Sequence, residues 1–289
     1  MKLGICTSIA NIEKAIDIGF DYVVLSGTEV SSLNADQFID LTDIVLKRNI
    51  DVSAFNGLCP SNIDIAGPNY SNEKARDYIR KLAERGKELG VRSLGIGAPN
   101  SRKIPKGFDR KKAWDNGRKF IEIAAEETSK YGMTVSIEEL TFKYCNFINT
   151  LEESRLMSTE LEDYNIPIII DFFHLEADGH EPEYAEDYIK YAYDVHVSGI
   201  DKTEGVPKRP FLNERDYDRL TKIADVLREN NYNKTVTLEP DPVDYGFEEK
   251  AIESLKQLRR VFWNTNDKYI CKLTDKWERN WKWELVLLA

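Results

Sequence analysis

The sequence contains no apolar run that approaches the roughly 20 residues needed to cross a bilayer. Its first residues are broken up by charged and polar side chains, which excludes the hydrophobic segment of a signal peptide. Basic residues are outnumbered, because 40 Lys and Arg stand against 50 Asp and Glu, and the formal charge is −10. An acidic surface repels anionic lipid and phosphate backbones, so we expect neither a membrane nor a nucleic acid as partner.

Cysteine is scarce, and its spacing is uninformative. Cys6, Cys59, Cys145 and Cys271 are scattered and form no CxxC pair. This usage predicts reduced thiols in a cytoplasmic protein. Nucleotide-binding signatures are missing as well, since no GxGxxG or GxxxxGK[ST] follows any apolar run.

Short apolar, β-branched runs recur along the chain. Several are apolar on both faces, as expected for strands that are covered on both sides. Eight such runs occur, at residues 2–7, 21–27, 51–57, 93–99, 134–140, 167–175, 194–199 and 235–240.

Segments of helical period lie between these runs. In residues 71–90 an apolar stripe faces a charged side, Ser71 can cap the start, and Gly90 can take the left-handed turn at the end. The last helical pattern covers about 247–262. A Gly or Asn stands just before most of the strands, at Gly19, Asn49, Gly90, Gly132, Asn165 and Asn233.

Strict alternation of strands and helices predicts an α/β fold with a parallel sheet and right-handed crossovers. Eight units favour closure into a (β/α)8 TIM barrel over an open doubly wound sheet. We assign residues 1–264 to this single domain. Residues 265–289 form a C-terminal extension rich in Trp, which we expect to pack on the barrel or at an oligomer interface.

Four polar residues interrupt the apolar pattern of the last four strands, near the strand ends that carry the active site in such barrels. They are Glu138, Asp171, His196 and Glu239. Because these strands are consecutive, the four side chains should converge. Three buried carboxylates repel one another unless a cation joins them. The oxygen-rich donor set predicts one divalent metal ion, with Mn²⁺ preferred and Zn²⁺, Co²⁺ or Mg²⁺ as alternatives.

Each residue also has an ordinary structural interpretation. Asp171 could simply cap the following helix, Glu138 and Glu239 could be surface carboxylates, and His196 could be a core histidine with satisfied hydrogen bonds. Glu139 competes with Glu138 for the inward position, since alternation along a strand allows only one of them to face inward.

The motifs IEELTFKYCNFINT (137–150), IDFFHLE (170–176), DVHVSGID (194–201) and TLEP (237–240) resemble the xylose isomerase-like barrel superfamily, in its sugar-phosphate isomerase/epimerase branch. The resemblance covers nearly all of residues 1–262. It implies a metal held by Glu138, Asp171, His196 and Glu239, and a substrate contact from His174. Asn146 matches a frequent Asn of the family, which implies a substrate contact from this residue too.

The sequence departs from this family around the substrate. Ketose epimerases carry Asn, Arg and often Glu after the metal ligand of the fifth strand, where this chain has Thr141, Phe142 and Tyr144. The second strand usually carries a Glu where Val24 stands. The resemblance therefore supports the class of chemistry better than any one substrate.

We expect a metal-dependent sugar isomerase or epimerase that transfers a proton through an enediolate, with Glu138 and Glu239 as the catalytic pair. The substrate would be a small ketose, a sugar phosphate or a related polyol ketone. Lys202, Lys208 and Arg209 follow the seventh strand, and they either contact substrate hydroxyls or a phosphate, or are solvated loop charges.

Three alternatives stay open at this point. One is dehydration of an inosose, which needs the same metal and base. Another is an endonuclease IV-like DNA repair enzyme, which the acidic charge and the three histidines disfavour. The last is a binding barrel without activity. The protein could form a homodimer or a homotetramer.

Overall fold

The computed structural model describes residues 1–243 and 245–263. In this part of the chain the strands form one closed barrel in chain order, and all neighbouring strands are parallel, including β8 against β1. The expected (β/α)8 barrel is therefore confirmed, and the alternative of an open doubly wound sheet is excluded. The strands are β1 (Lys2–Thr7), β2 (Tyr22–Ser26), β3 (Val52–Asn56), β4 (Ser93–Ile96), β5 (Thr134–Glu138), β6 (Ile168–Asp171), β7 (Ala192–Val197) and β8 (Thr235–Leu238).

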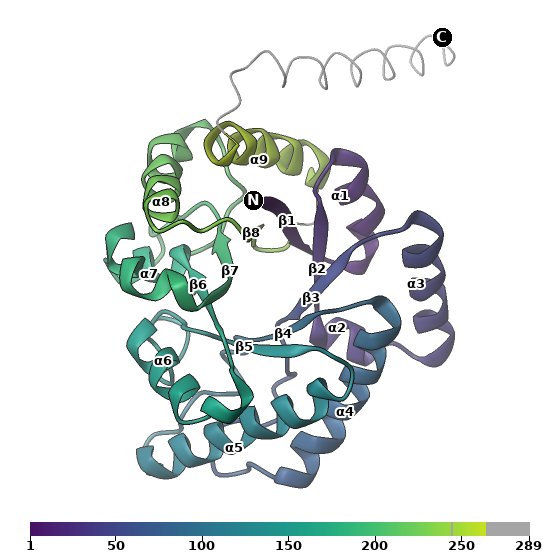
Figure 1. Ribbon diagram of the computed structural model, residues 1–289, viewed down its shortest axis with the longest axis vertical. Helices are drawn as coiled ribbons and strands as arrows, with labels where there is room; N and C mark the ends of the chain where they lie inside the picture. Colours follow the sequence, from purple (N-terminus) through teal and green to yellow (C-terminus); the bar gives the residue numbers. More distant parts are fainter. Residues whose placement is uncertain (244, 264–289) are drawn as a thin grey trace.

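Helices surround this barrel (Figure 1), and α9 packs against α1 and so brings the two ends of the barrel sequence together. In residues 1–243 and 245–263 the α-helices are α1 (Ile12–Ile18), α2 (Gly27–Ser32), α3 (Ala35–Arg48), α4 (Asn72–Leu89), α5 (Arg110–Ser129), α6 (Leu151–Thr159), α7 (Phe172–Ala177), α8 (Tyr217–Glu229) and α9 (Phe247–Phe262). Short 3₁₀ helices cover Ile9–Asn11, Glu162–Tyr164, Pro182–Tyr191 and Glu214–Asp216.

The predicted helix boundaries rest on local chemistry that the structure shows. The Ser71 hydroxyl accepts a hydrogen bond from the Lys74 N–H and caps α4, and Gly90 ends the helix in the left-handed conformation. The predicted turn residues Gly19, Asn49, Gly132 and Asn165 are left-handed too. Asn233 also stands just before β8, as predicted, but the left-handed residue of that turn is Asn231, with φ 56°.

Two elements differ from prediction. The sixth strand was expected to reach residue 175 but ends at Asp171, because its side chain accepts a hydrogen bond from the Phe173 N–H and starts α7. A further helix, α2, follows β2 directly and was not predicted. Its short sequence GTEVSS has no apolar stripe, and its start is set instead by the Ser26 hydroxyl, which accepts from the Glu29 N–H.

The main core lies between the strands and the surrounding helices, and a small separate cluster of Tyr22, Val24 and Ala54 lies apart from it. Polar groups on the strands pair with one another. The Ser93 and Ser136 hydroxyls lie 2.7 Å apart, and the Thr237 hydroxyl donates to an Asp194 oxygen at 2.6 Å. These pairs give the buried hydroxyl and carboxylate groups hydrogen-bond partners within the protein.

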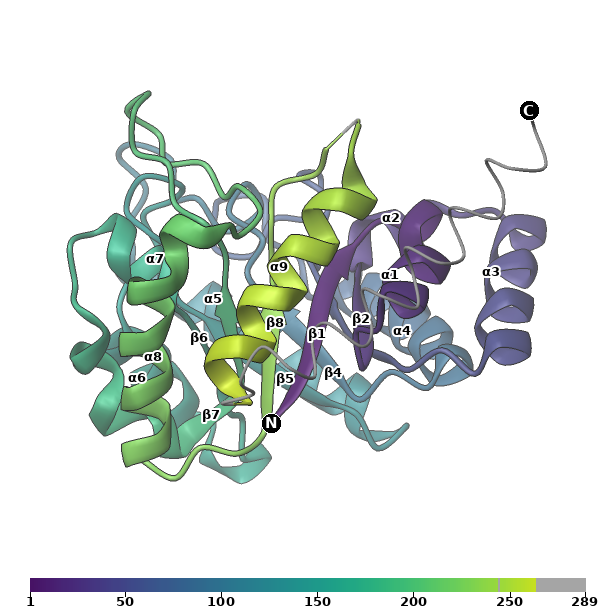
Figure 2. The same cartoon turned by 90° about the horizontal axis from the view of Figure 1, so that it is seen from above.

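The long loops after β7 and β8 rise on the side toward which the strand arrows point (Figure 2). Side chains at these strand ends therefore gather at one mouth of the barrel. Cys6, Cys59 and Cys145 are free, as expected, and Cys271 lies outside the described residues. None of the helices described is long and apolar enough to span a membrane. The predicted extension at residues 265–289 also lies outside the described residues, so its packing stays a prediction.

Candidate metal centre and active site

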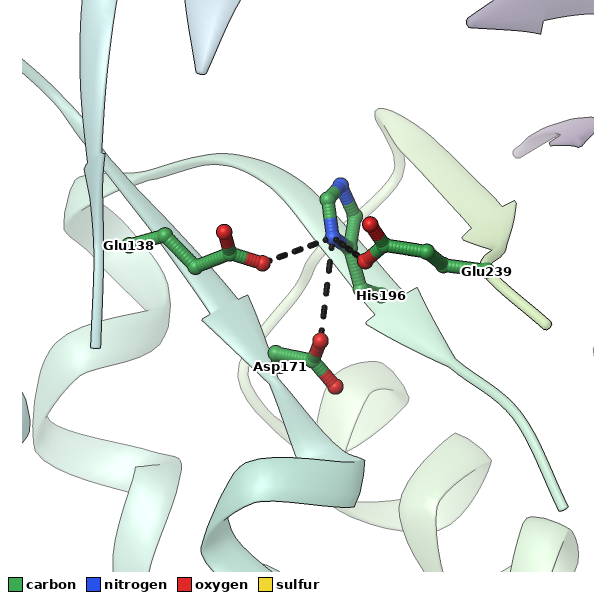
Figure 3. Close-up of side chains that lie close together, drawn as sticks. All are labelled: Glu138, Asp171, His196 and Glu239. Atoms are coloured by element: carbon green, nitrogen blue, oxygen red, sulfur yellow. Dashed lines mark hydrogen bonds and ion pairs between the residues drawn. The ribbon is translucent and has the colours of Figure 1, made fainter. Parts of the chain in front are cut away.

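Glu138, Asp171, His196 and Glu239 meet at the mouth of the barrel. Each offers one ligand atom, and these four atoms all lie within 4.8 Å of one another. Figure 3 shows the three carboxylates directed toward the Nδ1 side of the His196 ring. This nitrogen lies 3.1 Å from Glu138 Oε1, 2.9 Å from Glu239 Oε2 and 3.9 Å from Asp171 Oδ2.

The strand ends place these residues. Glu138 and Asp171 are the last residues of β5 and β6, His196 is next to last in β7, and Glu239 directly follows β8, with its N–H donating to the Val197 carbonyl at 2.9 Å. Gly97 makes room for this arrangement, because a Cβ atom there would lie 2.3 Å from Glu138 Oε2.

Asp171 both caps a helix and belongs to the cluster, which are the two roles that the sequence left open. Its Oδ1 accepts from the Phe173 N–H at 2.9 Å and caps α7, while its Oδ2 faces the cluster. Glu139 is not part of the cluster. Its Oε1 accepts from the Asp171 N–H at 2.8 Å and so supports the end of β6. Burial raises the pKa of Glu139 well above its ordinary value.

Arg209 lies against the same carboxylates. Its Nη2 is 2.6 Å from Asp171 Oδ2 and 3.0 Å from Glu239 Oε2, and its Nε donates to the Glu239 carbonyl at 2.8 Å. Only 6% of the residue is exposed. The interpretation of Arg209 as a solvated loop charge is therefore wrong: the carboxylates of the cluster compensate its buried charge.

The residues fit a divalent cation. Asp171 Oδ2 and Glu239 Oε2 are buried and have no partner with hydrogen-bond geometry, even though Arg209 lies near both. Three carboxylates thus face one guanidinium and one imidazole, with oxygen lone pairs directed at a common point. Carboxylate oxygen with one imidazole nitrogen is a donor set for hard or borderline divalent ions.

A profile of the family described as xylose isomerase-like TIM barrel matches residues 12–261. The chain belongs to this family. Several solved structures also resemble it in fold. The 3-keto-D-glucoside 4-epimerase of E. coli is 17% identical, with a TM-score of 0.71 over 90% of this chain and 99% of its own.

D-Psicose 3-epimerase from Clostridium cellulolyticum H10, determined with D-tagatose, is 17% identical, with a TM-score of 0.72 over 91% of this chain and 99% of its own. An L-ribulose 3-epimerase is 14% identical, with a TM-score of 0.71 over 95% and 98% of the two chains. At these identities the likeness shows the shared fold. No curated protein sequence gave a significant match.

The other predicted site residues of this xylose isomerase-like barrel, His174, Asn146 and Lys202, lie in three different surroundings. His174 is buried, with Nε2 3.7 Å from Asp171 Oδ2 and 3.4 Å from Arg209 Nη1. Asn146 pairs both of its amide atoms with the Ile104 backbone, and Lys202 donates to the Glu176 carbonyl. The structure brings neither Asn146 nor Lys202 to the cluster, and substrate contact by either one stays a prediction from sequence.

Tyr144, one of the departures from the family pattern, covers His174. The two rings meet edge to face with centroids 5.4 Å apart, and the Tyr144 hydroxyl donates to the Pro207 carbonyl at 3.0 Å. This contact joins the loop after β5 to the loop after β7. Burial lowers the pKa of His174 to about 3, so this side chain is neutral at physiological pH.

Sequence reasoning missed the support behind His196. On its far side, Nε2 lies 3.5 Å from Asp194 Oδ2 and 3.4 Å from the Asn56 amide nitrogen. A proton on Nε2 shared with Asp194 leaves Nδ1 free to bind a metal. Asp194 stands two residues before His196 on β7, so the alternation of a strand could have placed both on one face.

Opposite charges shift the pKa values of the cluster in different directions. Burial, followed by the charge of Glu239, raises the pKa of Glu138. Burial would raise the pKa of Glu239 as well, but the charges of Arg209 and His196 outweigh it and hold that pKa below its ordinary value. Burial would lower the pKa of His196, yet Glu239 and hydrogen bonds to Asp194 and Glu138 raise it well above its ordinary value.

Metal binding should release a proton near neutral pH. The raised pKa of His196 means that the metal-free site holds a proton which a metal ion must displace. Metal affinity should therefore increase with pH, by about tenfold per pH unit for each proton released, until His196 is neutral. Calorimetric titration with Mn²⁺ in buffers of different ionisation enthalpy measures the proton count directly. A metal affinity that does not change between about pH 6 and pH 8, the range in which histidine ordinarily titrates, would contradict this assignment.

Proposed function

We propose that this protein is a metal-dependent sugar isomerase or epimerase. The reaction is proton transfer at the carbon next to the carbonyl of a small ketose or a related polyol ketone. The convergence of Glu138, Asp171, His196 and Glu239 beside the buried charge of Arg209 carries this proposal. A cavity of about 330 Å³ adjoins the site and includes Arg209 and Glu239 in its wall, which gives room for a small molecule.

The four cluster residues would hold the ion, and their oxygen-rich donor set favours Mn²⁺ over Zn²⁺. When bound, a divalent ion supplies Lewis-acid polarisation of the substrate carbonyl and so lowers the barrier to removing the neighbouring proton. Asp194 keeps the His196 ring in its orientation, and Glu139 supports the strand end that carries Asp171.

Glu239 and Glu138 provide the two proton-transfer groups. The lowered pKa of Glu239 keeps it ionised as the base, and the raised pKa of Glu138 suits it to return a proton. Return to the same carbon from the opposite face inverts its configuration. Return to the neighbouring carbon exchanges the aldose and ketose forms, and the proton of the neighbouring hydroxyl then moves to the former carbonyl oxygen.

Arg209 and His174 would bind the oxygen that gains negative charge. The guanidinium stays charged, because Asp171 and Glu239 raise its pKa despite burial. His174 is neutral and can donate or accept a hydrogen bond without adding charge. Donors that are already in position stabilise a developing oxyanion at little cost in reorganisation.

Deuterium wash-in tests this proposal. The Mn²⁺-loaded protein is incubated in D₂O with D-tagatose, D-fructose, L-ribulose, hydroxypyruvate and an inosose, and the products are followed by NMR and mass spectrometry. We expect deuterium at the carbon next to the carbonyl, together with an epimer or isomer. Loss of water from the inosose would instead identify a dehydratase. A metal-loaded protein that exchanges no proton on any of these compounds would contradict the proposal.

A further inference from the structure

The cavity beside the cluster extends away from the reacting groups. From Arg209 and Glu239 it crosses the ends of β1, β2 and β3 and reaches the start of α2. The wall at this far end carries polar side chains that can bond to hydroxyl groups, namely Ser8, Asn11, Ser26 and Glu29, while Asn56 lies nearer the cluster, against His196. A ligand held at the cluster would place its remaining carbons and their substituents here.

The charges of this wall are unfavourable for an anion. Among the described residues that line the cavity, Glu29, Glu239 and Asp241 are acidic and Arg209 is the one cation. Arg209 already contacts Asp171 and Glu239, and its backbone N–H donates to Asp241 Oδ2 at 2.7 Å. A divalent ion and Arg209 would together offset the three carboxylates of the cluster. Glu29 and Asp241 would still leave the cavity acidic.

The nearby lysines do not supply a phosphate site. Lys208 pairs with Glu204 on the exposed loop after β7, and its side chain is 58% exposed. Lys202 donates to the Glu176 carbonyl in the same region. Neither residue lines the cavity. A phosphate at its far end would therefore face the Glu29 carboxylate, with no lysine or arginine beside it among the described lining residues.

Glu29 is free to accept further hydrogen bonds. Its two carboxylate oxygens share one donor, the Ile9 N–H, at 3.2 and 3.3 Å. A carboxylate offers about four acceptor positions, so most of its capacity remains. Its backbone is fixed, because the Ser26 hydroxyl accepts from the Glu29 N–H at 3.2 Å at the start of α2.

We propose that the cavity takes the uncharged, hydroxyl-bearing end of an unphosphorylated ketose, and that Glu29 is a specificity-determining residue that accepts hydrogen bonds from those hydroxyls. The inference rests on the proposed isomerase or epimerase function and names its substrate class. Hydrogen bonds from hydroxyls to an ionised acceptor are stronger than those to a neutral one. The same carboxylate repels a phosphate ester, so one residue provides both attraction and exclusion.

The test compares D-fructose with D-fructose 6-phosphate on the Mn²⁺-loaded protein, by calorimetric binding and by deuterium wash-in. We expect the unphosphorylated sugar to bind at least about tenfold more tightly. Glu29→Gln keeps an oxygen for the Ile9 N–H but removes the charge. It should raise KM for D-fructose by about tenfold with a much smaller effect on kcat, and it should reduce the discrimination against the phosphate ester.

Two further variants serve as controls. Glu29→Asp keeps the charge on a shorter side chain, so it should still discriminate against the phosphate ester. Glu73→Gln changes an exposed carboxylate in the first turn of α4, outside the cavity, and should behave as the unaltered protein. Thermal melts of all variants establish that each one folds.

The outcomes separate this inference from the proposed function. If the protein exchanges the proton of D-fructose 6-phosphate and binds it as tightly as D-fructose or more tightly, the inference is wrong and the proposed function stands. Absence of exchange on every ketose would overturn the proposed function. In that case the calorimetric affinities decide the inference. It survives if Glu29→Gln reduces the ratio of the affinity for D-fructose to that for D-fructose 6-phosphate. It fails if this ratio is unaltered or if neither sugar binds.

Discussion

Glu239→Gln should reduce proton exchange on a ketose by about a thousandfold, because a neutral amide cannot accept the substrate proton. The substitution keeps the shape of the side chain. The two backbone contacts of this residue, from its N–H to Val197 and from Arg209 Nε to its carbonyl, do not involve the carboxylate. The fold should therefore persist with the loss of exchange in kcat, and any fall in Tm reports the lost pairing of Glu239 with Arg209 or with the metal.

Deuterium wash-in measured by NMR gives the rate, and metal analysis of the same sample separates the two roles of Glu239. A variant that keeps its metal but loses exchange identifies a base. A variant that loses both its metal and its exchange activity identifies Glu239 as a metal ligand, and its role as a base then needs another test. Glu204→Gln, an exposed carboxylate in the loop after β7, is the matched control and should exchange at the unaltered rate. If Glu239→Gln itself exchanges at that rate, the assignment of the base is wrong.

The barrel was predictable because its signals are local. Alternating apolar strands and amphipathic helices repeat along the chain, and residues such as Ser71 and Gly90 mark helix ends by their own backbone chemistry. The helix α2 was not predictable in this way, since it is short and its position depends on contacts with the loop after β3. The Thr28 hydroxyl donates to the Gly57 carbonyl at 2.8 Å, across a separation that sequence patterns do not show.

The convergence of the four cluster residues was predictable for a different reason. Each is a polar residue at the end of an apolar strand, and the barrel places consecutive strand ends side by side. Arg209 could not be placed like this. It lies in a polar, charged segment of a loop, and its burial depends on Asp171, Glu239 and Asp241, which come from other strands and loops. A buried charge is recognised only when its partners are known.

Removal of the metal should abolish exchange and also lower the stability of the protein. Without an ion, the carboxylates of Glu138, Asp171 and Glu239 are held within 4.8 Å with Arg209 and His196 as their compensating groups. An ion that binds only the folded chain stabilises it by about 4 kcal/mol when its free concentration exceeds Kd a thousandfold. For a domain of this size that corresponds to roughly 10 °C in Tm.

Dialysis against a chelator, followed by thermal melts and exchange assays with added Mn²⁺, Co²⁺, Zn²⁺ or Mg²⁺, measures both effects on one preparation. We expect the highest exchange rate with Mn²⁺, because three of the four donors are carboxylates. Stability need not follow the same order, since Zn²⁺ generally binds such sites more tightly than Mn²⁺. His196→Gln removes the nitrogen donor and should lose most of the metal-dependent rise in Tm. A chelated protein that retains full exchange would show that the chemistry at this cluster needs no ion, and a rise in Tm that persists in His196→Gln would place the bound metal elsewhere.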